Sequence, residues 1–232
     1  MKPPRNDTSP DSDELIGRLL ADADPVRPLW SPGVRLALWL LLDAGIIGLV
    51  VIFSPRPDIA QQLLRPAFLL QQGTLLAAGA AFAMLALRGA VPGSDAGPSE
   101  RSAALLLVVA AFGLLLQEPV QPQSLAAFMT TGAVCFVCTL LLGVLPWTAL
   151  FIAVRRGAPL LGARVGAHAG AGALLFAAGA SRLSCPLEDG LHVMAWHGSP
   201  VAVVTLLSAL AGAAWLEAWR SRPGPGRAGL LP

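Results

Sequence analysis

The sequence predicts an all-α polytopic membrane protein with six transmembrane helices and both termini in the cytoplasm. Its 232 residues are 55% hydrophobic and only 13% charged, whereas charged residues make up about a quarter of an average soluble domain. Too few charges are present to cover a soluble protein of this length, which excludes the soluble classes. The net charge of +2 gives no support for direct binding of nucleic acid, because that requires a surface rich in unpaired Lys and Arg.

Six apolar segments are candidates to cross the bilayer, a distance that needs about 20 residues of helix. In chain order they are 35–53, 67–87, 102–116, 131–154, 160–181 and 199–219. The fourth lies in a longer apolar stretch, which leaves room for an interfacial piece before it, and Gly143 and Pro146 predict a bend within it. The predicted organisation is a cytoplasmic segment at 1–34, a six-helix transmembrane domain at 35–219 and a flexible cytoplasmic tail at 220–232.

The distribution of positive charge predicts the orientation of these spans. Lys and Arg gather in the cytoplasmic loops of membrane proteins. With the N-terminus inside, the cytoplasmic segments hold thirteen of the sixteen basic residues, and the outside segments hold only Arg56, Arg65 and Arg182. Five or seven spans would remove this asymmetry.

A short amphipathic helix is predicted within the cytoplasmic segment, at about 12–24. Asp13 and Glu14 lie where a helix N-terminus favours negative charge. Four apolar residues follow at helical spacing and share one face: Leu15, Ile16, Leu19 and Leu20. A helix this short is marginal alone in water, so its apolar face needs a surface.

Two interpretations of this helix are open. It lies on the membrane or on the protein's own cytoplasmic face, or it docks onto a soluble partner. Helices that lie on anionic membranes are usually rich in Lys and Arg. This one is mostly acidic, which favours a basic partner.

The three cysteines all lie near the outer side of the membrane in this topology. Cys135 and Cys138 fall in the first half of the fourth span, and Cys185 follows the fifth span in a polar loop. Disulfides persist on the outer side of a bacterial membrane. A CxxC inside an apolar helix is not a thioredoxin-type motif, and either of its thiols can be a small core residue. Cys185 is expected to be reactive or paired.

Two histidines, His192 and His197, share the outer loop with Cys185. Together the three side chains offer ligands for a transition metal, although their spacing matches no common zinc motif. The alternative is a pair of interfacial histidines beside Trp196. His168 in the fifth span is expected to hydrogen-bond between helices.

Asp43 lies in the middle of the first span, where a charge costs several kcal/mol unless it is paired or neutral. It is either a proton-relay group or part of a structural contact. Gln71 and Gln72 of the second span are the expected partners for such a contact.

Several separate stretches of the chain resemble the NrsF-type anti-sigma factors, a family whose name stands for negative regulator of sigma F. They are DELIGRLLADADPVRPLWSPGVRLALWL at 13–40, RRGAPLLGARVGAHAGAGAL at 155–174, CP at 185–186 and WHG at 196–198. The resemblance covers nearly the whole chain apart from the region of spans two and three.

This resemblance implies a multi-pass protein of the bacterial inner membrane that holds an extracytoplasmic-function sigma factor inactive at its cytoplasmic face. It implies that two periplasmic-side cysteines sense heavy-metal or oxidative stress. Cys185 matches one by its CP motif and Cys135 the other by its place ahead of Arg155, which leaves Cys138 as an extra thiol. Such a protein is not an enzyme and has no permanent cofactor, and a heavy-metal ion at the outer cysteines would be transient. The sigma factor would bind the acidic and apolar residues of the predicted N-terminal helix.

Other classes remain open from the residues themselves. A small membrane thiol oxidoreductase or a metal-ion transporter would use the three cysteines and Asp43. A purely structural membrane subunit would use none of them. The Gly-rich phosphate loops and paired carboxylates that would indicate an enzyme are missing from the sequence.

Overall fold

The computed structural model describes residues 12–21, 28–118, 120, 124–187 and 189–216, together with the backbone but not the side chain of Leu19. All regular secondary structure in these residues is helical, as predicted. The elements are α1 (Ser12–Ala21), α2 (Pro32–Phe53), α3 (Ile59–Gln62), α4 (Pro66–Gly89), α5 (Pro98–Leu115), α6 (Leu125–Arg155), α7 (Gly162–Arg182), α8 (Gly190–His192), η1 (Val193–His197), α9 (Gly198–Ala211) and η2 (Gly212–Leu216).

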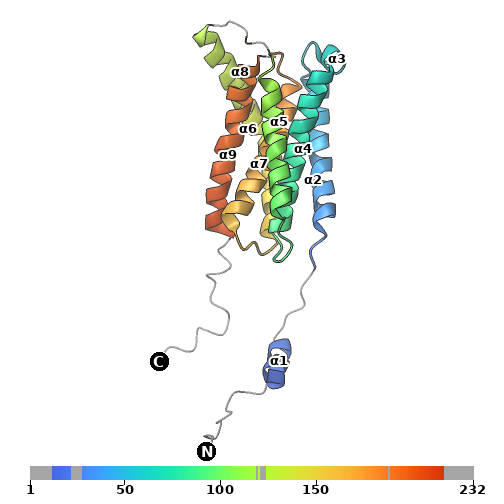
Figure 1. Ribbon diagram of the computed structural model, residues 1–232, viewed down its shortest axis with the longest axis vertical. Coiled ribbons are helices and arrows are strands. Elements are labelled where there is room, and N and C mark those ends of the chain that lie inside the picture. The colour runs from blue at the N-terminus through green and yellow to red at the C-terminus, as the bar shows by residue number, and fades with distance from the viewer. Residues whose placement is uncertain (1–11, 22–27, 119, 121–123, 188, 217–232) are drawn as a thin grey trace, which may run out of the picture.

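Six long helical segments form an antiparallel bundle, in which α8, η1, α9 and η2 follow one another as the sixth segment (Figure 1). Because the direction alternates, α2 begins and η2 ends at the same end of the bundle. We call this the N-terminal end. The opposite end carries α3 and the loop after α7, and we call it the cysteine end.

Local sequence signals set the helix starts. The Ser31 hydroxyl accepts a hydrogen bond from the Val34 amide and Pro32 occupies the first turn of α2, a position that suits proline because its missing N–H has no helical partner there. Ser124 caps α6 in the same way, accepting from the Ala127 amide at 3.2 Å. Pro66 and Pro98 open α4 and α5.

Five segments among the described residues are long and apolar enough to cross a membrane. They are α2, α4, α5, α6 and the composite segment Gly190–Leu216. Their outward-facing side chains include many exposed Leu, Val and Ile residues, which is the surface expected in contact with lipid rather than water. The prediction of an all-α polytopic membrane protein is confirmed at this level.

Helix α7 is the least apolar of the six because protein surrounds it. It is rich in Gly and Ala and is buried along nearly its whole length against α4, α6 and α9. A Cβ atom on Gly166 would lie 2.1 Å from the Ser208 carbonyl oxygen of α9, and one on Gly172 would lie 2.8 Å from the Ala83 nitrogen of α4. Small residues therefore allow close contact between helices, and α7 occupies the centre of the bundle.

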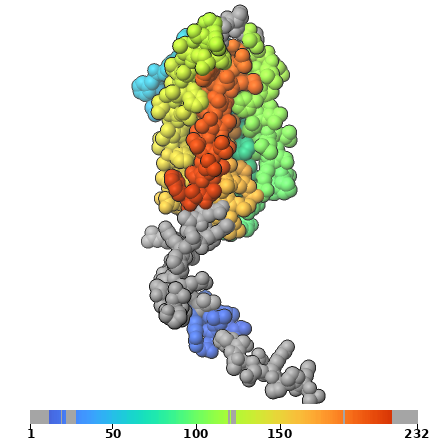
Figure 2. All heavy atoms as spheres, turned by 90° about the vertical axis from the view of Figure 1, so that its left-hand side faces the viewer, coloured from blue at the N-terminus to red at the C-terminus, as the bar shows by residue number. Residues whose placement is uncertain are grey.

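One face of the bundle is formed around the last segment. Figure 2 shows α9 running along the middle of this face, between α6 and α5. The last segment meets α6 through Trp196 of η1, whose ring centroid lies 5.5 Å from that of Phe128.

Asp43 is buried in α2, with 2% of its surface exposed, but it does not contact the two glutamines as expected. Gln71 donates to the Leu114 carbonyl and to Glu118, and Gln72 donates to the Gly179 carbonyl at 2.9 Å. The reason is depth. Asp43 lies ten residues from the cysteine end of α2, about 15 Å along the axis at 1.5 Å per residue, whereas Gln71 lies only five residues from that end of α4.

Helix α1 lies apart from the bundle in Figure 1. Its apolar residues Leu15, Ile16 and Leu20 are all exposed. Glu14 and Arg18 form an ion pair of 2.6 Å across one turn. The rest of the predicted range, 22–24, lies outside the described residues.

Candidate functional site

Four potential metal ligands meet at the cysteine end of the bundle. Cys135 comes from α6, Cys185 from the loop after α7, His192 from the end of α8 and His197 from the end of η1. The Sγ atoms of the two cysteines lie 3.6 Å apart, and Nε2 of His192 lies 3.7 Å from Cys185 Sγ. One ligand atom from each of the four residues lies within 4.8 Å of all the others.

The π-helical turn η1 explains how both histidines reach this point. In an α-helix, residues five apart differ in direction by about 140°, since each turn holds 3.6 residues. The i→i+5 bonding of a π-helix widens the turn and brings such residues toward the same side. The rings of His192 and His197 accordingly lie 5.7 Å apart, and both are buried. They are part of the last helical segment and not of an outer loop as the sequence suggested.

The spacing of the four groups fits a tetrahedral metal site. Zinc binds Cys sulfur at about 2.3 Å and His nitrogen at about 2.0–2.1 Å. The corresponding tetrahedron has edges of about 3.8 Å between sulfurs and about 3.6 Å between sulfur and nitrogen. The two sulfur-centred distances in the cluster, 3.6 and 3.7 Å, are close to these values. Two sulfur and two nitrogen ligands suit zinc and other thiophilic ions.

Two hydroxyl groups hold His197 in place. Nδ1 of His197 lies 2.9 Å from Ser181 Oγ and 3.5 Å from Thr139 Oγ1, and the two hydroxyls lie 3.0 Å from each other. Nε2 of His197 has no hydrogen-bond partner among the described residues. Outer-shell hydrogen bonds of this kind orient a metal-binding imidazole and fix its tautomer.

Cys185 is the thiol most easily ionised in this cluster. Hydrogen bonding from Cys135, followed by contacts with His192 and His197, holds the pKa of Cys185 below its usual range although burial opposes the shift. The deprotonated thiolate of cysteine, and not the thiol, acts as a nucleophile and as a metal ligand. The site therefore favours the reactive form of Cys185 near neutral pH.

A cavity leads to the two sulfurs from the side of the bundle between α2 and α6. Its volume is about 750 Å³, and its lining includes all three cysteines together with Ser181 and Ser184. Cys138 is exposed on α6 and is not one of the four clustered residues. Cys135 and Cys185 thus line a cavity and are not sealed within the bundle.

The loop that carries Cys185 is tied to the loop between α2 and α4. The Arg56 amide donates to the Leu183 carbonyl at 2.9 Å. The Arg56 guanidinium binds Asp58 through two hydrogen bonds, of 2.7 and 3.0 Å, and reaches the Pro186 carbonyl at 3.5 Å. Hydrogen bonds from Arg56 and Gln62 lower the pKa of Asp58. This network fixes the backbone on both sides of Cys185.

Sequence reasoning placed Cys185, His192 and His197 in one candidate metal site, and the structure adds Cys135. It missed the supporting hydroxyls of Thr139 and Ser181. A signal was present for Thr139, which lies four residues after Cys135 within the predicted fourth span, a spacing that shares one helix face. Ser181 is the last residue of the predicted fifth span, and Cys185 lies in the loop that follows it. Asp43 and His168 lie outside this cluster.

Helix α6 extends from the cluster to the N-terminal end, where it is bonded to α2. Trp39 of α2 donates from Nε1 to the Pro146 carbonyl at 3.0 Å, and Arg35 donates to the Ala153 carbonyl. The helix that carries Cys135 is thus joined at two points to the helix that follows the N-terminal segment.

A family model described as "Negative regulator of sigma F" matches residues 19–219. This match covers most of the chain. The protein belongs to the NrsF family. The resemblance noted in the sequence is thereby confirmed, and no curated protein and no solved structure matches the chain.

Membership in the NrsF family makes the protein a negative regulator of a sigma factor, and its partner is a sigma factor. A regulatory family of this kind indicates a non-enzymatic role. The matched region includes all four clustered residues and every helix from α2 to η2, but only the last three residues of α1. Its apolar helices are those of a multi-pass membrane protein.

Proposed function

We propose that this protein is an anti-sigma factor of the bacterial inner membrane that sequesters an extracytoplasmic-function sigma factor at its cytoplasmic face. It releases the sigma factor under heavy-metal or oxidative stress, sensed at Cys135 and Cys185 on the periplasmic side. The observation that carries this proposal is the cluster of Cys135, Cys185, His192 and His197 at the end of the bundle opposite α1.

The proposed topology has six spans, with the N-terminal end of the bundle in the cytoplasm. Six alternating helical segments support it, because α7, with 21 residues, is within the range of 18 to 31 residues of the other five. The basic residues support the orientation, since those near the N-terminal end far outnumber those near the cysteine end and positive charge gathers on the cytoplasmic side.

Helix α1 is the proposed docking element for the sigma factor. It presents three exposed apolar side chains, Leu15, Ile16 and Leu20, next to the acidic Asp13 and Glu14 of its first turn. An amphipathic helix of this kind can bind in a groove of a partner. Negative charge suits a sigma factor, which needs a basic surface to bind DNA phosphates, so occupation of that surface keeps it from DNA.

Two chemical events at the cluster can serve as the signal. A thiophilic cation can bind the two sulfurs and two imidazoles, with loss of any proton still held by the thiols. Alternatively, the two thiols can form a disulfide, in which two S–H bonds break and one S–S bond forms. The two electrons and two protons then pass to a peroxide, which is reduced to water and, for an organic peroxide, an alcohol. The close approach of four ligand atoms favours the cation.

Helix α6 is the proposed carrier of the signal. Cys135 lies in its first half, and its second half holds the carbonyls bonded by Trp39 and Arg35 of α2. A shift of α6 on metal binding would change the position of α2, the helix that follows the N-terminal segment in the chain. Release requires two arrangements with different affinity for the sigma factor.

Co-purification of the full chain with the sigma factor from its own genome tests the docking step. Replacing Leu15, Ile16, Leu19 and Leu20 with Ser is expected to abolish co-purification without affecting membrane insertion. Gly17→Ala is the matched control, since nothing lies within 4 Å of Gly17. A cysteine-free variant is expected to retain binding. Undiminished binding by the four-Ser variant would refute the role of α1, and ion flux in liposomes without sigma binding would indicate a transporter.

A further inference from the structure

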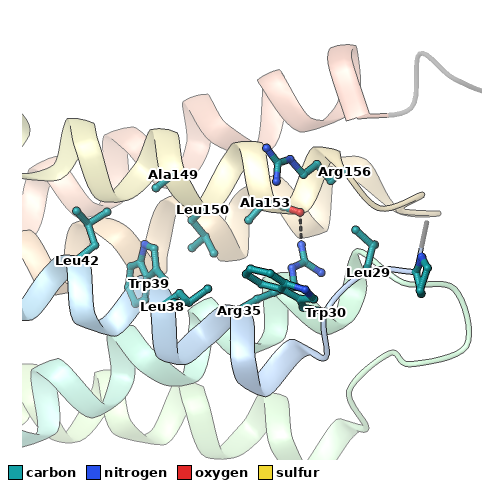
Figure 3. Close-up of a pocket in the computed structure, with 11 residues that line it drawn as sticks. Leu29, Trp30, Arg35, Leu38, Trp39, Leu42, Ala149, Leu150, Ala153 and Arg156 are labelled. Atoms are coloured by element: carbon teal, nitrogen blue, oxygen red, sulfur yellow. Dashed lines mark hydrogen bonds between the residues drawn. The ribbon is translucent and has the colours of Figure 1, made fainter. Parts of the chain in front are cut away.

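A groove lies between α2 and α6 at the N-terminal end of the bundle, far from the cysteines. Its volume is about 350 Å³. Leu38, Trp39 and Leu42 of α2 and Ala149 and Leu150 of α6 form its apolar walls (Figure 3). Its walls therefore extend about two turns along the spanning helices.

Two arginines, Arg35 and Arg156, stand at the cytoplasmic mouth of this groove, and neither has a carboxylate partner among the residues that the structure describes. Arg35 is only 9% exposed. Its NH2 group donates to the Ala153 carbonyl, while its NH1 group has no hydrogen-bond partner among the described residues. Arg156 lies across from it at the end of α6 (Figure 3), and no ion pair among those residues involves either guanidinium. A buried charge of this kind is costly unless an anion accompanies it.

The position of the groove matches the boundary between lipid headgroups and hydrocarbon. Arg35 lies in the first turn of α2, next to the exposed Trp30, and indole side chains are enriched at this depth of a membrane. Val34 and Leu38 of α2 are exposed on the bundle surface. The groove thus has a positively charged mouth at the headgroup level and an apolar wall at the level of the acyl chains.

We propose that this groove is a binding site for an anionic phospholipid. The phosphate accepts hydrogen bonds from Arg35 and Arg156, and one acyl chain lies along Leu38, Leu42 and Ala149. Basic pockets between spanning helices on the cytoplasmic side are a known way to bind anionic headgroups. The carboxylates of helix α1 could pair with the two arginines. They would not cover the apolar wall, which lies alongside the hydrocarbon of the membrane. The proposal is independent of the docking role of α1.

Lipid retention by the full chain, measured by native mass spectrometry after exchange into mixtures of phosphatidylglycerol and phosphatidylcholine, tests this site. The wild type is expected to retain phosphatidylglycerol at least tenfold better, since a guanidinium–phosphate pair is charge-assisted. Arg156→Gln and Arg35→Gln are each expected to reduce that preference severalfold. Arg155→Gln removes the same charge beside the groove without touching its lining and is expected to leave the preference unchanged.

Four outcomes would overturn the lipid site. Equal retention of the two lipids by the wild type would show that the arginines do not select an anion. An equal loss in Arg155→Gln and Arg156→Gln would show a general charge effect. Displacement of the lipid by millimolar glycerol 3-phosphate or inorganic phosphate would show a site for the free anion. Retention of phosphatidylglycerol that appears only after removal of residues 1–24 would show that α1 occupies the groove in the full chain. Because Arg156 is exposed, its variant remains informative even if Arg35→Gln does not fold.

Discussion

The Sγ atoms of Cys135 and Cys185 lie 3.6 Å apart, although 50 residues separate them in the chain. The two sulfurs come from opposite sides of the contact between α6 and α7. With His192 and His197 they form a closed set of ligand atoms beneath a cavity. A single ion bound by all four groups would therefore fix α6, the loop after α7 and the last helical segment relative to one another, whereas a disulfide would join only α6 and that loop.

Loss of one clustered ligand should weaken metal binding far more than loss of the third cysteine. Cys185→Ser and His197→Ala are each expected to lower the affinity for Cd²⁺ by at least about 100-fold, because each removes one direct ligand from a site where even outer-shell changes cost 10–100-fold. Cys138→Ser is the control. Titration of the thiolate-to-metal absorption against a competing chelator measures the difference, and similar affinities for all three variants would refute the four-ligand site.

Disulfide formation between Cys135 and Cys185 should depend only weakly on pH. The pKa of Cys185 is lowered in the folded protein, so its thiolate is present well below the ordinary thiol pKa of about 8.5. With diamide as oxidant, the rate is expected to change little between pH 8 and pH 6, whereas an ordinary thiol would slow nearly 100-fold. Replacing both His192 and His197 with Ala should increase the pH dependence only in part, because the hydrogen bond from Cys135, the largest cause of the lowered pKa, remains. A steep fall in the wild type would contradict a stabilised thiolate.

Gly132 should be required for the contact between α6 and η1. A Cβ atom at this position would lie 2.0 Å from the Trp196 ring, so Gly132→Ala must push the two helices apart. We expect a loss of about 1–3 kcal/mol in stability, typical of overpacking, together with weaker metal binding. Gly113→Ala in α5 has nothing within 4 Å and should be neutral or slightly stabilising. Thermal unfolding in detergent, followed by circular dichroism, compares the two, and equal melting temperatures would disprove the contact.

Trp39 should be needed for release and not for binding. Phe in its place keeps an apolar ring next to Phe176, whose centroid lies 5.0 Å away, but loses the hydrogen bond to the Pro146 carbonyl. Trp39→Phe is expected to bind the sigma factor normally and to require several times more Cd²⁺ for half-maximal release. Trp30→Phe, at an exposed position, is the control. An unchanged cadmium dependence would show that the signal does not pass through this bond.

The sequence was informative about helices because lipid imposes a simple pattern on them. Long apolar runs with few charges inside them identify α2, α4, α5 and α6, whose outer faces are expected to contact lipid rather than water. Helix α7 is a different case: its Gly and Ala residues serve contact with protein, so its hydropathy is low although it is the most buried. The hydrophobic pattern of α7 therefore does not reveal whether its low hydropathy comes from contact with protein or from a weakly apolar membrane span.

The candidate site was less accessible to sequence reasoning because its geometry depends on a local change of helix type. His192 and His197 point apart in an ideal α-helix, and only the π-helical turn at Val193–His197 brings them together. The choice between Cys135 and Cys138 depended on which face of α6 meets α7, which no local pattern reveals. Asp43 lacks its expected glutamine contact because the two spans place these residues at different depths.

The most direct test of the account is release of the sigma factor from its complex with the full chain in lipid nanodiscs on addition of Cd²⁺. The wild type and Cys138→Ser are expected to release it at cadmium concentrations that fill the site. Cys185→Ser and His197→Ala are expected to retain it under the same conditions. Equal release from all four complexes, or retention by the wild type with cadmium bound, would contradict a sensor formed by Cys135, Cys185, His192 and His197.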